Sequence, residues 1–236
     1  MFNVNKICQI IRFVTKFDIM NEDLLNYLNS VRRDFAGKPF NEETVNHNPV
    51  EQFQVWIEEA INAQLVDPYA MSISTVNENG QPSTRIVYLR GMKDDGFIFY
   101  TNYNSNKGKA LAVNNKVALN FLWRELERQV RIEGEVVKVS EAESDQYFAQ
   151  RPRESQIGAW ASNQSYTIKN REELESKVVF YTEKFKDSNV PRPPHWGGYQ
   201  VKPNKIEFWQ GRPNRLHDRI LFTRSGNNWS ISRLAP

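Results

Sequence analysis

The sequence has few of the residues that build metal sites and disulfides. Its 236 residues contain a single cysteine, Cys8, and three histidines that lie far apart, His47, His195 and His217. One cysteine excludes an internal disulfide framework and a CxxC metal site, and the histidines do not have the spacing of zinc ligands. We therefore expect no metal, and the shortage of cysteine favours a reducing, cytoplasmic setting.

Other absences narrow the class of function. No apolar run reaches the ~18 residues of a membrane span, and the net charge of +3 is too small to indicate a nucleic-acid-binding protein by itself. The sequence also lacks the GxGxxG and GxxxxGK[ST] phosphate loops, the HExxH pair and the GxSxG hydrolase elbow. A phosphate ligand would therefore have to be held by side chains rather than by a glycine-rich loop.

Residues 1–20 differ in character from the rest of the chain. They are basic and mildly amphipathic, with Lys6, Arg12 and Lys16, and they lack the clean apolar centre and cleavage site of a signal peptide. A weak organelle presequence, a membrane-surface helix and an extension upstream of the true start all fit this pattern. We favour an extension that is non-native or disordered, because Met20 is followed by "NEDLLNYL", a natural-looking beginning. Residues 21–236 are then expected to form one domain.

Hydrophobic patterning predicts a β-rich chain with helices between the strands. An aromatic content of 12%, with six Trp, indicates a packed globular core. Helical spacing and caps occur at residues 21–34, 49–65, 106–115, 140–151 and 171–186. Strand patterns occur at 69–76, 83–92, 97–102, 117–123, 127–140 and 205–211, followed by a hairpin at 219–234 that turns at Gly226-Asn227. This order favours an α+β fold, an antiparallel β-barrel with surrounding helices.

Basic and hydroxyl side chains recur where the predicted strands end. Arg85 and Arg90 flank one strand, and Lys107 lies at a helix start, where amide donors and the helix dipole favour an anion. A second cluster has Tyr147 and Arg151 on one face of a predicted helix and Ser155 in the loop expected to follow it. Its phenol, guanidinium and hydroxyl together suit a phosphate. Any one arginine by itself is more simply explained by a surface ion pair. The two clusters together suggest two phosphorylated ligands.

The segment "RLHDR" places Arg215, His217 and Arg219 at alternate positions. In an extended strand these side chains would share one face, where like charges repel unless an anionic or electron-rich group lies opposite. Gln129, in a strand pattern, can bond along the edge of a ring, and Trp209 could flank a planar cofactor. The simpler explanations are a cross-strand hydrogen bond for Gln129 and a core position for Trp209.

Taken together, these motifs resemble one family, the pyridoxamine/pyridoxine 5′-phosphate oxidases. The resemblance runs from about residue 24 to the end of the chain, and "RPRESQIGAW" and "RLHDR" are too long and specific for chance agreement. The segments that carry it are "RIVYL" (85–89), "FYTN" (99–102), "LERQVRIEG" (126–134), "YFAQRPRESQIGAWASNQS" (147–165), "WGGYQV" (196–201), "IEFWQG" (206–211), "RLHDR" (215–219) and "RLAP" (233–236).

The resemblance implies a split β-barrel that binds FMN at the interface of a homodimer, with both subunits contributing to each site. It implies oxidation of pyridoxamine 5′-phosphate or pyridoxine 5′-phosphate to pyridoxal 5′-phosphate, a step of vitamin B6 salvage. Dioxygen would reoxidise the flavin and leave as hydrogen peroxide, and the amine substrate would also release ammonia. Neither a nucleic acid nor a membrane partner is expected.

The resemblance also assigns residues to the two ligands. The FMN set is Arg85, Ile86, Val87, Tyr88, Leu89, Arg90, Tyr100, Thr101, Asn106, Lys107, Gln129, Gln164, Ser165, Trp209 and Arg219. The substrate set is Arg32, Arg33, Asp34, Phe35, Arg90, Tyr147, Arg151, Ser155, Arg215, Leu216 and His217. Within these sets, Arg215 and His217 are the catalytic pair and would face the pyridine ring. The segment 32–35 would fold over the site.

Three side chains receive roles in the chemistry. Arg219 would stabilise the negative charge that a flavin gains on reduction. Arg215 would orient the substrate, and His217 would bond a polar substituent or relay a proton, with orientation as the favoured role.

Two positions depart from the family's pattern. Position 90 is usually Lys and is Arg90 here, which keeps the charge but changes the geometry of a phosphate contact. The residue before Lys107 is often Arg and is Asn106 here, which removes one contact to the FMN phosphate; Lys109, one turn away, is the candidate replacement.

Two rival classes of function would use similar residues. A flavin-binding module without oxidase activity would need no second phosphate clamp. A polyanion- or RNA-binding barrel would need a continuous basic stripe, which the sequence does not show. Yellow colour and turnover of pyridoxamine 5′-phosphate would separate the three classes.

Overall fold

A computed structural model describes residues 22–93 and 96–236, and the chain divides into two units, Met1–Phe35 and Ala36–Pro236. The described part of the first unit contains one helix, α2 (Glu22–Ser30), which is shorter than the predicted helix at 21–34. The predicted extension at residues 1–20 lies outside the described residues.

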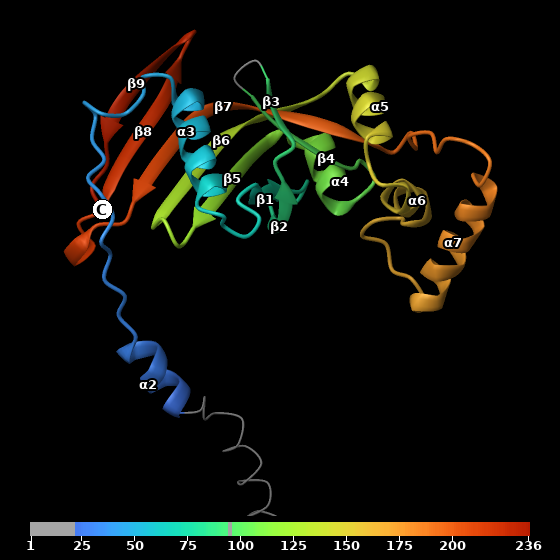
Figure 1. The fold of residues 1–236 in the computed structure, drawn as a ribbon, viewed down its shortest axis with the longest axis horizontal. Helices are drawn as coiled ribbons and strands as arrows, with labels where there is room; N and C mark the ends of the chain where they lie inside the picture. The colour runs from blue at the N-terminus through green and yellow to red at the C-terminus, as the bar shows by residue number, and fades with distance from the viewer. Residues whose placement is uncertain (1–21, 94–95) are drawn as a thin grey trace, which may run out of the picture. The chain divides into compact units, whose positions relative to one another are not determined.

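The second unit is an antiparallel split β-barrel with helices around it, which confirms the predicted fold class (Figure 1). Its described strands are β1 (Ala70–Val76), β2 (Pro82–Tyr88), β3 (Gly91–Lys93), β4 (Gly96–Asn102), β5 (Lys116–Trp123), β6 (Arg128–Lys138), β7 (Trp196–Gln210), β8 (Asp218–Ser225) and β9 (Asn228–Arg233). Its described helices are α3 (Pro49–Asn62), α4 (Asn106–Val113), α5 (Glu141–Ala149), α6 (Arg153–Ala161), α7 (Arg171–Lys184) and the short 3₁₀ helix η1 (Pro213–Arg215). The strand order is β2-β1-β5-β6-β7-β4-β3, with β8 paired to β7 and β9 to β8.

Strand β7 organises the sheet, because three other strands pair with it. One edge of β7 pairs with β6, while on the other edge residues 196–201 pair with β4 and residues 205–210 pair with β8. The β6–β7 register shifts at Gly134, where an added Cβ would overlap the carbonyl of Lys202. A bulge of this kind bends a strand and increases its twist. The sheet therefore divides along β7 into a lobe with β4 and a lobe with β8 and β9.

The predicted strand at 83–92 is two strands, because the chain changes partners between Tyr88 and Gly91. The N–H of Leu89 donates to the carbonyl of Tyr69 at 2.9 Å, beside β1, and the N–H of Arg90 donates to the carbonyl of Ile98 on β4 at 2.8 Å. Two successive residues are thus hydrogen-bonded to segments near opposite ends of the strand order, one beside β1 and one on β4. These two hydrogen bonds bring the ends of the sheet together and close the barrel.

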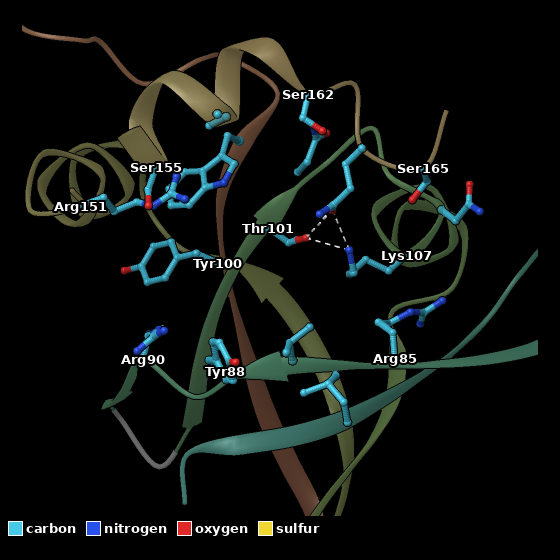
Figure 2. A pocket seen from close by; sticks show the side chains of 18 of the residues that line it. Arg85, Tyr88, Arg90, Tyr100, Thr101, Lys107, Arg151, Ser155, Ser162 and Ser165 are labelled. Carbon is cyan, nitrogen blue, oxygen red and sulfur yellow. Dashed lines mark hydrogen bonds between the residues drawn. The ribbon is translucent and has the colours of Figure 1, made fainter. Parts of the chain in front are cut away.

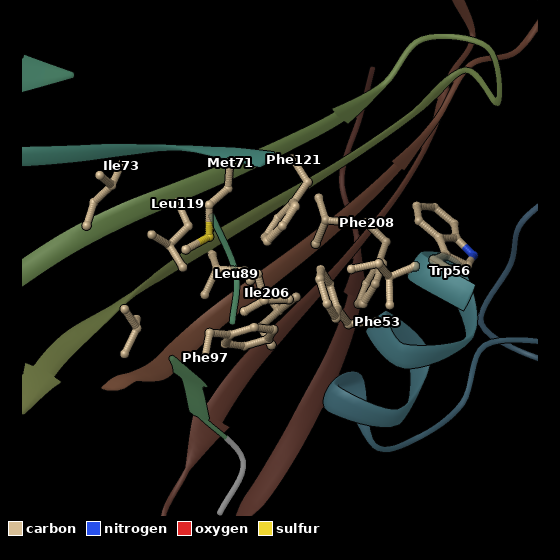
Figure 3. Packing of buried hydrophobic residues seen from close by; sticks show 14 of the residues in the cluster. Phe53, Trp56, Met71, Ile73, Leu89, Phe97, Leu119, Phe121, Ile206 and Phe208 are labelled. Atoms are coloured by element: carbon tan, nitrogen blue, oxygen red, sulfur yellow. The ribbon is translucent and has the colours of Figure 1, made fainter. Parts of the chain in front are cut away.

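Helix α3 fills one side of the barrel core (Figure 3). Asn48 caps it by accepting the N–H of Val50, and Pro49 occupies the first turn, as its fixed φ allows. The ring of Phe53 on α3 lies 4.9 Å from the rings of both Phe97 and Phe121, and all three are fully buried. Truncating such a residue typically costs about 3–5 kcal/mol of unfolding free energy, so α3 is integral to the barrel.

A second apolar cluster packs against the first half of β7. Helices α5, α6 and α7 meet around it, and its buried members are Phe148, Ile157, Phe185, Val190 and Trp196. Because this cluster fixes α6 relative to β7, it also fixes the space between them.

Three further differences from the predicted elements concern the segments that carry candidate site residues. Helix α6 was not predicted, and Ser155, expected in a loop, lies on it. Strand β7 begins at Trp196 rather than at residue 205. Strand β8 begins at Asp218, so the premise that Arg215, His217 and Arg219 share one strand face is wrong: Arg215 ends η1 with φ +62°, and His217 lies between η1 and β8.

Two further properties concern the described residues only. No helix among them is long and apolar enough to cross a membrane. They contain no group of three or more His, Cys, Asp or Glu side chains arranged to hold a metal ion.

Candidate active site

A cavity of about 820 Å³ lies between β2 and β4 on one side and α4 and α6 on the other (Figure 2). This volume is within the usual range of small-molecule sites, about 300–1,000 Å³. The residues that surround it are Ser83, Thr84, Arg85, Ile86, Val87, Tyr88, Arg90, Tyr100, Thr101, Asn102, Asn106, Lys107, Tyr147, Arg151, Ser155, Gly158, Ala159, Ser162, Gln164, Ser165 and Trp196.

The cavity is lined by cations and by no acidic side chain. Its four cations are Arg85, Arg90, Lys107 and Arg151, and the lining contains neither Asp nor Glu. In the described part of the chain none of the four forms an ion pair with a carboxylate. Figure 2 shows Arg90, Arg151 and Ser155 toward one end and Arg85, Lys107 and Ser165 toward the other. The four positive charges are thus arranged as two pairs that would each attract an anion.

Lys107 and Arg85 form the first pair of cations, and Arg90 and Arg151 form the second pair. Lys107 is buried, with 8% of its surface exposed. Ser105 caps α4 and sets Lys107 in the first turn. The Lys107 amine donates to Oε1 of Gln164 at 2.8 Å and to Oγ1 of Thr101 at 3.1 Å. Burial, and secondarily the charge of Arg85, lowers the pKa of Lys107 to about 8. A buried ammonium with neutral partners would be stabilised by an anion.

Arg85 is held in place by its own strand and the neighbouring one. Its guanidinium donates to Oγ1 of Thr75 at 2.7 Å on β1 and to Oγ of Ser83 at 2.6 Å on β2. Burial lowers the pKa of Arg85. The side chain is therefore oriented without any carboxylate partner.

Arg151 of the second pair has an unsatisfied donor. Its guanidinium lies over the ring of Trp196, 4.6 Å from the centroid, and Nη1 is buried without a hydrogen-bond partner. Burial lowers the pKa of Arg151; Tyr147 opposes this effect and Arg90 adds to it. Arg90 in turn lies over the rings of Tyr88 and Tyr69 at 4.9 and 5.2 Å. A buried donor without a partner needs an acceptor that the described chain does not supply.

Three stacked aromatic rings form a wall beside this second pair. The Tyr100 and Tyr147 rings are 3.8 Å apart and almost parallel at 3°, and the Trp196 ring lies 5.5 Å from Tyr100 at 9°. Burial raises the pKa of Tyr100 to about 12, so its hydroxyl stays protonated. An added Cβ at Gly198 would lie 2.7 Å from the Tyr100 ring, which explains why glycine occurs there in β7.

A second cluster of predicted residues lies in the other lobe, on β6, β7 and β8. Gln129 pairs with Trp209 across β6 and β7, and Trp209 pairs with Arg219 across β7 and β8. The His217 ring lies 4.6 Å from the Trp209 ring. The charge of Arg215 influences His217, which places these side chains in one neighbourhood.

Arg219 is fixed by a buried carboxylate. Its Nε donates to Oε1 of Glu207 at 2.8 Å, and its Nη1 donates to the carbonyl of Ala235 at 2.8 Å. The hydrogen bond to Glu207 raises the pKa of Arg219. Glu207, with 7% of its surface exposed, also accepts from Nη1 of Arg131 at 3.1 Å. Sequence patterns gave no indication of this role for Glu207.

His217 has a defined protonation state. The backbone N–H of Arg212 donates to Nδ1 of His217 at 3.1 Å, so Nδ1 carries no proton. Burial, and then the charge of Arg215, lowers the pKa of His217. The ring is therefore neutral near pH 7 and carries its proton on Nε2.

The cavity and the second cluster of predicted residues are far apart within one chain. Trp196 lines the cavity and Trp209 belongs to the second cluster, and both lie on β7, thirteen positions apart. At ~3.3 Å per residue this corresponds to roughly 40 Å along a straight strand. One small ligand cannot contact both clusters of the same chain.

The structure thus separates the predicted site residues into groups. Fourteen line the cavity: Arg85, Ile86, Val87, Tyr88, Arg90, Tyr100, Thr101, Asn106, Lys107, Tyr147, Arg151, Ser155, Gln164 and Ser165. The second cluster and its neighbouring turn hold six: Gln129, Trp209, Arg215, Leu216, His217 and Arg219. Leu89 is a core residue with 8% exposure. The segment 32–35 belongs to the first unit, where the Arg33 guanidinium lies 5.6 Å from the ring of Phe35.

Several lining residues were not predicted. Trp196 and Gly158 lie within segments that carry the family resemblance, "WGGYQV" and "RPRESQIGAW", but nothing in their local pattern indicated a cavity. Lys109, the candidate replacement for an arginine at position 106, lines a neighbouring cavity, and its amine lies 4.4 Å from the ring of Tyr166.

Comparison with known proteins identifies a family for most of the chain. Residues 57–183 match the family model described as pyridoxamine 5′-phosphate oxidase. Residues 196–236 match the model described as the pyridoxine 5′-phosphate oxidase C-terminal dimerisation region.

Individual relatives agree with the family models. The pyridoxine/pyridoxamine 5′-phosphate oxidase of Burkholderia mallei (strain SAVP1) is 52% identical over 212 residues, covering 89% of this chain and 99% of that protein. The enzyme of the same name from Acaryochloris marina (strain MBIC 11017) is 51% identical over 209 residues, covering 89% of this chain and 95% of that protein.

Two solved structures are similar in fold. PhzG from Burkholderia lata 383, in complex with tetrahydrophenazine-1-carboxylic acid, has a TM-score of 0.80 and 30% identity, covering 84% of this chain and 98% of that one. A pyridoxamine 5′-phosphate oxidase-related, FMN-binding protein from Nostoc punctiforme PCC 73102 has a TM-score of 0.64, covering 78% of this chain and 97% of that one. At 18% identity, the second likeness concerns the fold alone.

Proposed function

Because the chain belongs to the pyridoxamine 5′-phosphate oxidase family, we propose that it is an FMN-dependent oxidase that converts pyridoxamine or pyridoxine 5′-phosphate to pyridoxal 5′-phosphate. One observation carries the proposal: a single cavity holds two pairs of cations, no carboxylate and a buried Arg151 donor without a partner. Two phosphorylated ligands that meet end to end would satisfy both pairs at once.

The first pair fits the phosphate of FMN. Lys107 supplies a buried ammonium, Arg85 a second charge, and Thr101 and Gln164 orient the amine. The start of α4 adds backbone donors. Asn106 lines the same end and offers an amide in place of a charge.

The second pair fits the phosphate of the substrate. Nη1 of Arg151 is buried without an acceptor among the described residues, and Ser155 and Tyr147 line the same cavity. Arg90, stacked on two tyrosine rings, would add a second guanidinium. A phosphate oxygen is the strong acceptor that such guanidinium donors suit.

We further propose that the active unit is a homodimer in which the second cluster of one subunit completes the cavity of the other. Roughly 40 Å of β7 separates the two clusters within a chain, so Trp209, Arg215 and His217 cannot act on a ligand in their own cavity. A two-fold axis would bring each cluster to the partner's cavity and make two equal sites. The match of residues 196–236 to a dimerisation region supports this arrangement.

In this arrangement the protein orients the rings and places charge. FMN held by Lys107 and Arg85 would supply the acceptor for a hydride from the substrate's C4′ carbon, and dioxygen would take up the two electrons with two protons as hydrogen peroxide, while hydrolysis of the oxidised amine would release ammonia. Arg219, fixed by Glu207, would provide a positive charge that need not reorganise. Arg215 would close over the substrate, and His217 would donate from Nε2 to a polar ring substituent. The segment 32–35 is proposed to cover the site.

Purified protein tests the proposal directly. It should be yellow or become so with FMN, and it should produce peroxide and the aldehyde absorbance when pyridoxamine 5′-phosphate and oxygen are added. A protein that stays colourless and inactive after FMN is added would refute the oxidase, and yellow protein without turnover would favour a flavin carrier. The likeness to PhzG makes a reduced phenazine carboxylic acid the necessary comparison substrate.

We also propose that the protein acts in the cytoplasm.

A further inference from the structure

Gly158 lies within a helix, at a position where the backbone conformation does not require glycine. It is the sixth residue of α6, and its φ is outside the left-handed region. Glycine in a helix interior is less favourable than alanine, because it loses more backbone freedom on folding. Some other requirement must therefore exclude a side chain.

Packing within the described chain does not supply that requirement. A Cβ built on Gly158 would have no heavy atom within 4 Å beyond its own helical backbone, whereas a Cβ on Gly198 would lie 2.6 Å from the side chain of Val139. Gly80 and Gly226 also face open space, but their φ angles of +79° and +60° favour glycine. Gly158 has neither a close neighbour nor an unusual backbone.

The open space beside Gly158 is part of the cavity. One face of α6 and its C-cap residue line it, through small residues at helical spacing: Ser155, Gly158 and Ala159 on the helix and Ser162 at the cap. Figure 2 shows Ser155 near Arg151 and Ser162 toward the end that holds Ser165 and Lys107. Helix α6 therefore extends along the cavity from one cation pair toward the other, with Gly158 between them.

Spacing along the helix indicates which part of a ligand would reach Gly158. It lies three residues after Ser155, which is about 4.5 Å along the axis. A methylene-phosphate linker spans a similar length. With a phosphate at Arg151 and Ser155, the ring that carries it would lie against the backbone at Gly158.

We propose that Gly158 determines substrate specificity: the missing side chain lets the pyridine ring of a phosphorylated substrate lie directly on α6. This inference rests on the proposed function. A methyl group at position 158 would occupy the place of the ring edge without touching the phosphate end. It should hinder ligands that carry a ring and leave inorganic phosphate unaffected.

The variants Gly158→Ala and Gly158→Val, with Glu154→Ala as control, test this proposal. Glu154 is an exposed residue of the same helix outside the cavity lining. In Gly158→Ala, KM for pyridoxamine 5′-phosphate should rise about tenfold, and further in Gly158→Val. FMN affinity and inhibition by inorganic phosphate should change less than about twofold. The melting temperature of the FMN-free Gly158→Ala protein should be equal or higher by up to about 4 °C. Glu154→Ala should keep the wild-type KM.

The contrary outcomes are separable. An unchanged KM in both Gly158 variants overturns the proposal. Weaker FMN binding with unchanged KM would place the flavin, not the substrate, at Gly158, and dissociation into monomers would place the partner subunit there; either result overturns it. If the wild type does not oxidise pyridoxamine 5′-phosphate, the proposed function fails by itself. Binding of pyridoxal 5′-phosphate then decides: equal affinity in wild type and Gly158→Ala refutes the role of Gly158, and weaker binding in the variant supports it.

Discussion

The backbone N–H of Arg212 and Nδ1 of His217 are joined by a hydrogen bond of 3.1 Å. A backbone amide can only donate, so the neutral ring carries its proton on Nε2 and presents a donor there. This relationship supports the orienting role that was favoured for His217 over a proton relay. We propose that it is a fixed donor that orients the substrate, since a proton relay through Nδ1 would require breaking the bond to Arg212.

Substitutions at His217 distinguish a donor from a base. A glutamine amide can place an N–H near the position of Nε2 but cannot act as a base, so His217→Gln should keep more of kcat/KM than His217→Ala. Losing one hydrogen bond to the substrate should cost His217→Ala about 0.5–1.5 kcal/mol, or about twofold to thirteenfold in kcat/KM. Steady-state kinetics at pH 7.5 provide the comparison. Equal losses in the two variants would contradict the donor role.

The pH profile gives a second test of His217. Burial and Arg215 lower its pKa, so the neutral form persists to below the ordinary value of 6.5. As pH falls through the lowered pKa, Nδ1 gains a proton, the bond from Arg212 is lost and activity should decline. The acid limb of kcat/KM is therefore expected below pH 6.5. His217→Gln should lose the part of this limb that belongs to His217 and keep only a part that belongs to the substrate phosphate, whose second pKa is near 6. A limb centred above 6.5 would show that the ring is not held neutral.

Lys107 should make FMN binding depend on pH. Burial lowers its pKa to about 8 in the FMN-free chain, so the amine loses its charge as pH rises through that value. A phosphate monoester is already doubly charged there, because its second pKa is near 6. FMN affinity, followed by quenching of flavin fluorescence, should therefore weaken between pH 7 and 9.5.

The matched variants are Lys107→Met and Lys107→Arg. Lys107→Met should bind FMN about tenfold to a hundredfold more weakly at pH 7, as expected for a lost charge-assisted hydrogen bond of ~1.5–3 kcal/mol, and should show no fall near pH 8. Lys107→Arg keeps a charge at all these pH values, so its affinity should be independent of pH. A pH dependence that persists in Lys107→Met would assign the titration to another group.

The sequence was most informative where chemistry is local. Lys107 at a helix start and the turn at Gly226-Asn227 follow from caps and turn residues, and the structure confirms both. The alternation at Arg215 and His217 was misleading, because a 3₁₀ turn with Arg215 at φ +62° precedes the strand. Alternation by itself does not distinguish a strand from an irregular turn.

Positions determined by distant packing were not accessible from the sequence. Strand β7 begins at Trp196 and continues through Gly197 and Gly198, although glycine is a poor strand former. Glycine occurs at both positions because aromatic rings from other elements occupy the space that a side chain would need. The role of Glu207 is also tertiary, since the arginines that it binds come from β6 and β8. Family resemblance identified Arg219, but Arg131 and the carboxylate that binds both arginines required the fold.

Arg151 should recognise the substrate phosphate. Its Nη1 is buried without a partner, so Arg151→Ala removes both a charge and a poised donor. KM for pyridoxamine 5′-phosphate should rise about tenfold to a hundredfold, consistent with ~1.5–3 kcal/mol for a charged hydrogen bond. Turnover of pyridoxamine without its phosphate should be the same in Arg151→Ala and in the wild type. An equal loss with both substrates would mean that Arg151 supports the fold rather than the phosphate.

Mixed dimers test whether two chains build each site. The FMN concentration is kept below the dissociation constant of Lys107→Met, so that this substitution disables the cavity, while Trp209→Ala damages the second cluster. Each homodimer should then have little activity. If the cluster of one chain completes the cavity of the other, a heterodimer has one site with both defects and one intact site. Random exchange of equal amounts makes half of all dimers mixed, which predicts recovery of about a quarter of the wild-type activity per chain.

The alternative arrangement gives the opposite result. If both clusters of one chain served the same site, every site in a mixed dimer would carry a defect and mixing would restore nothing. Mixing Lys107→Met with Arg85→Ala is the matched control, because both residues line the same cavity and neither arrangement then yields an intact site. Recovery in the first mixture and not in the control requires a site shared between subunits. That result would explain why β7 places Trp196 and Trp209 at opposite ends of one strand, since each end would serve a different active site.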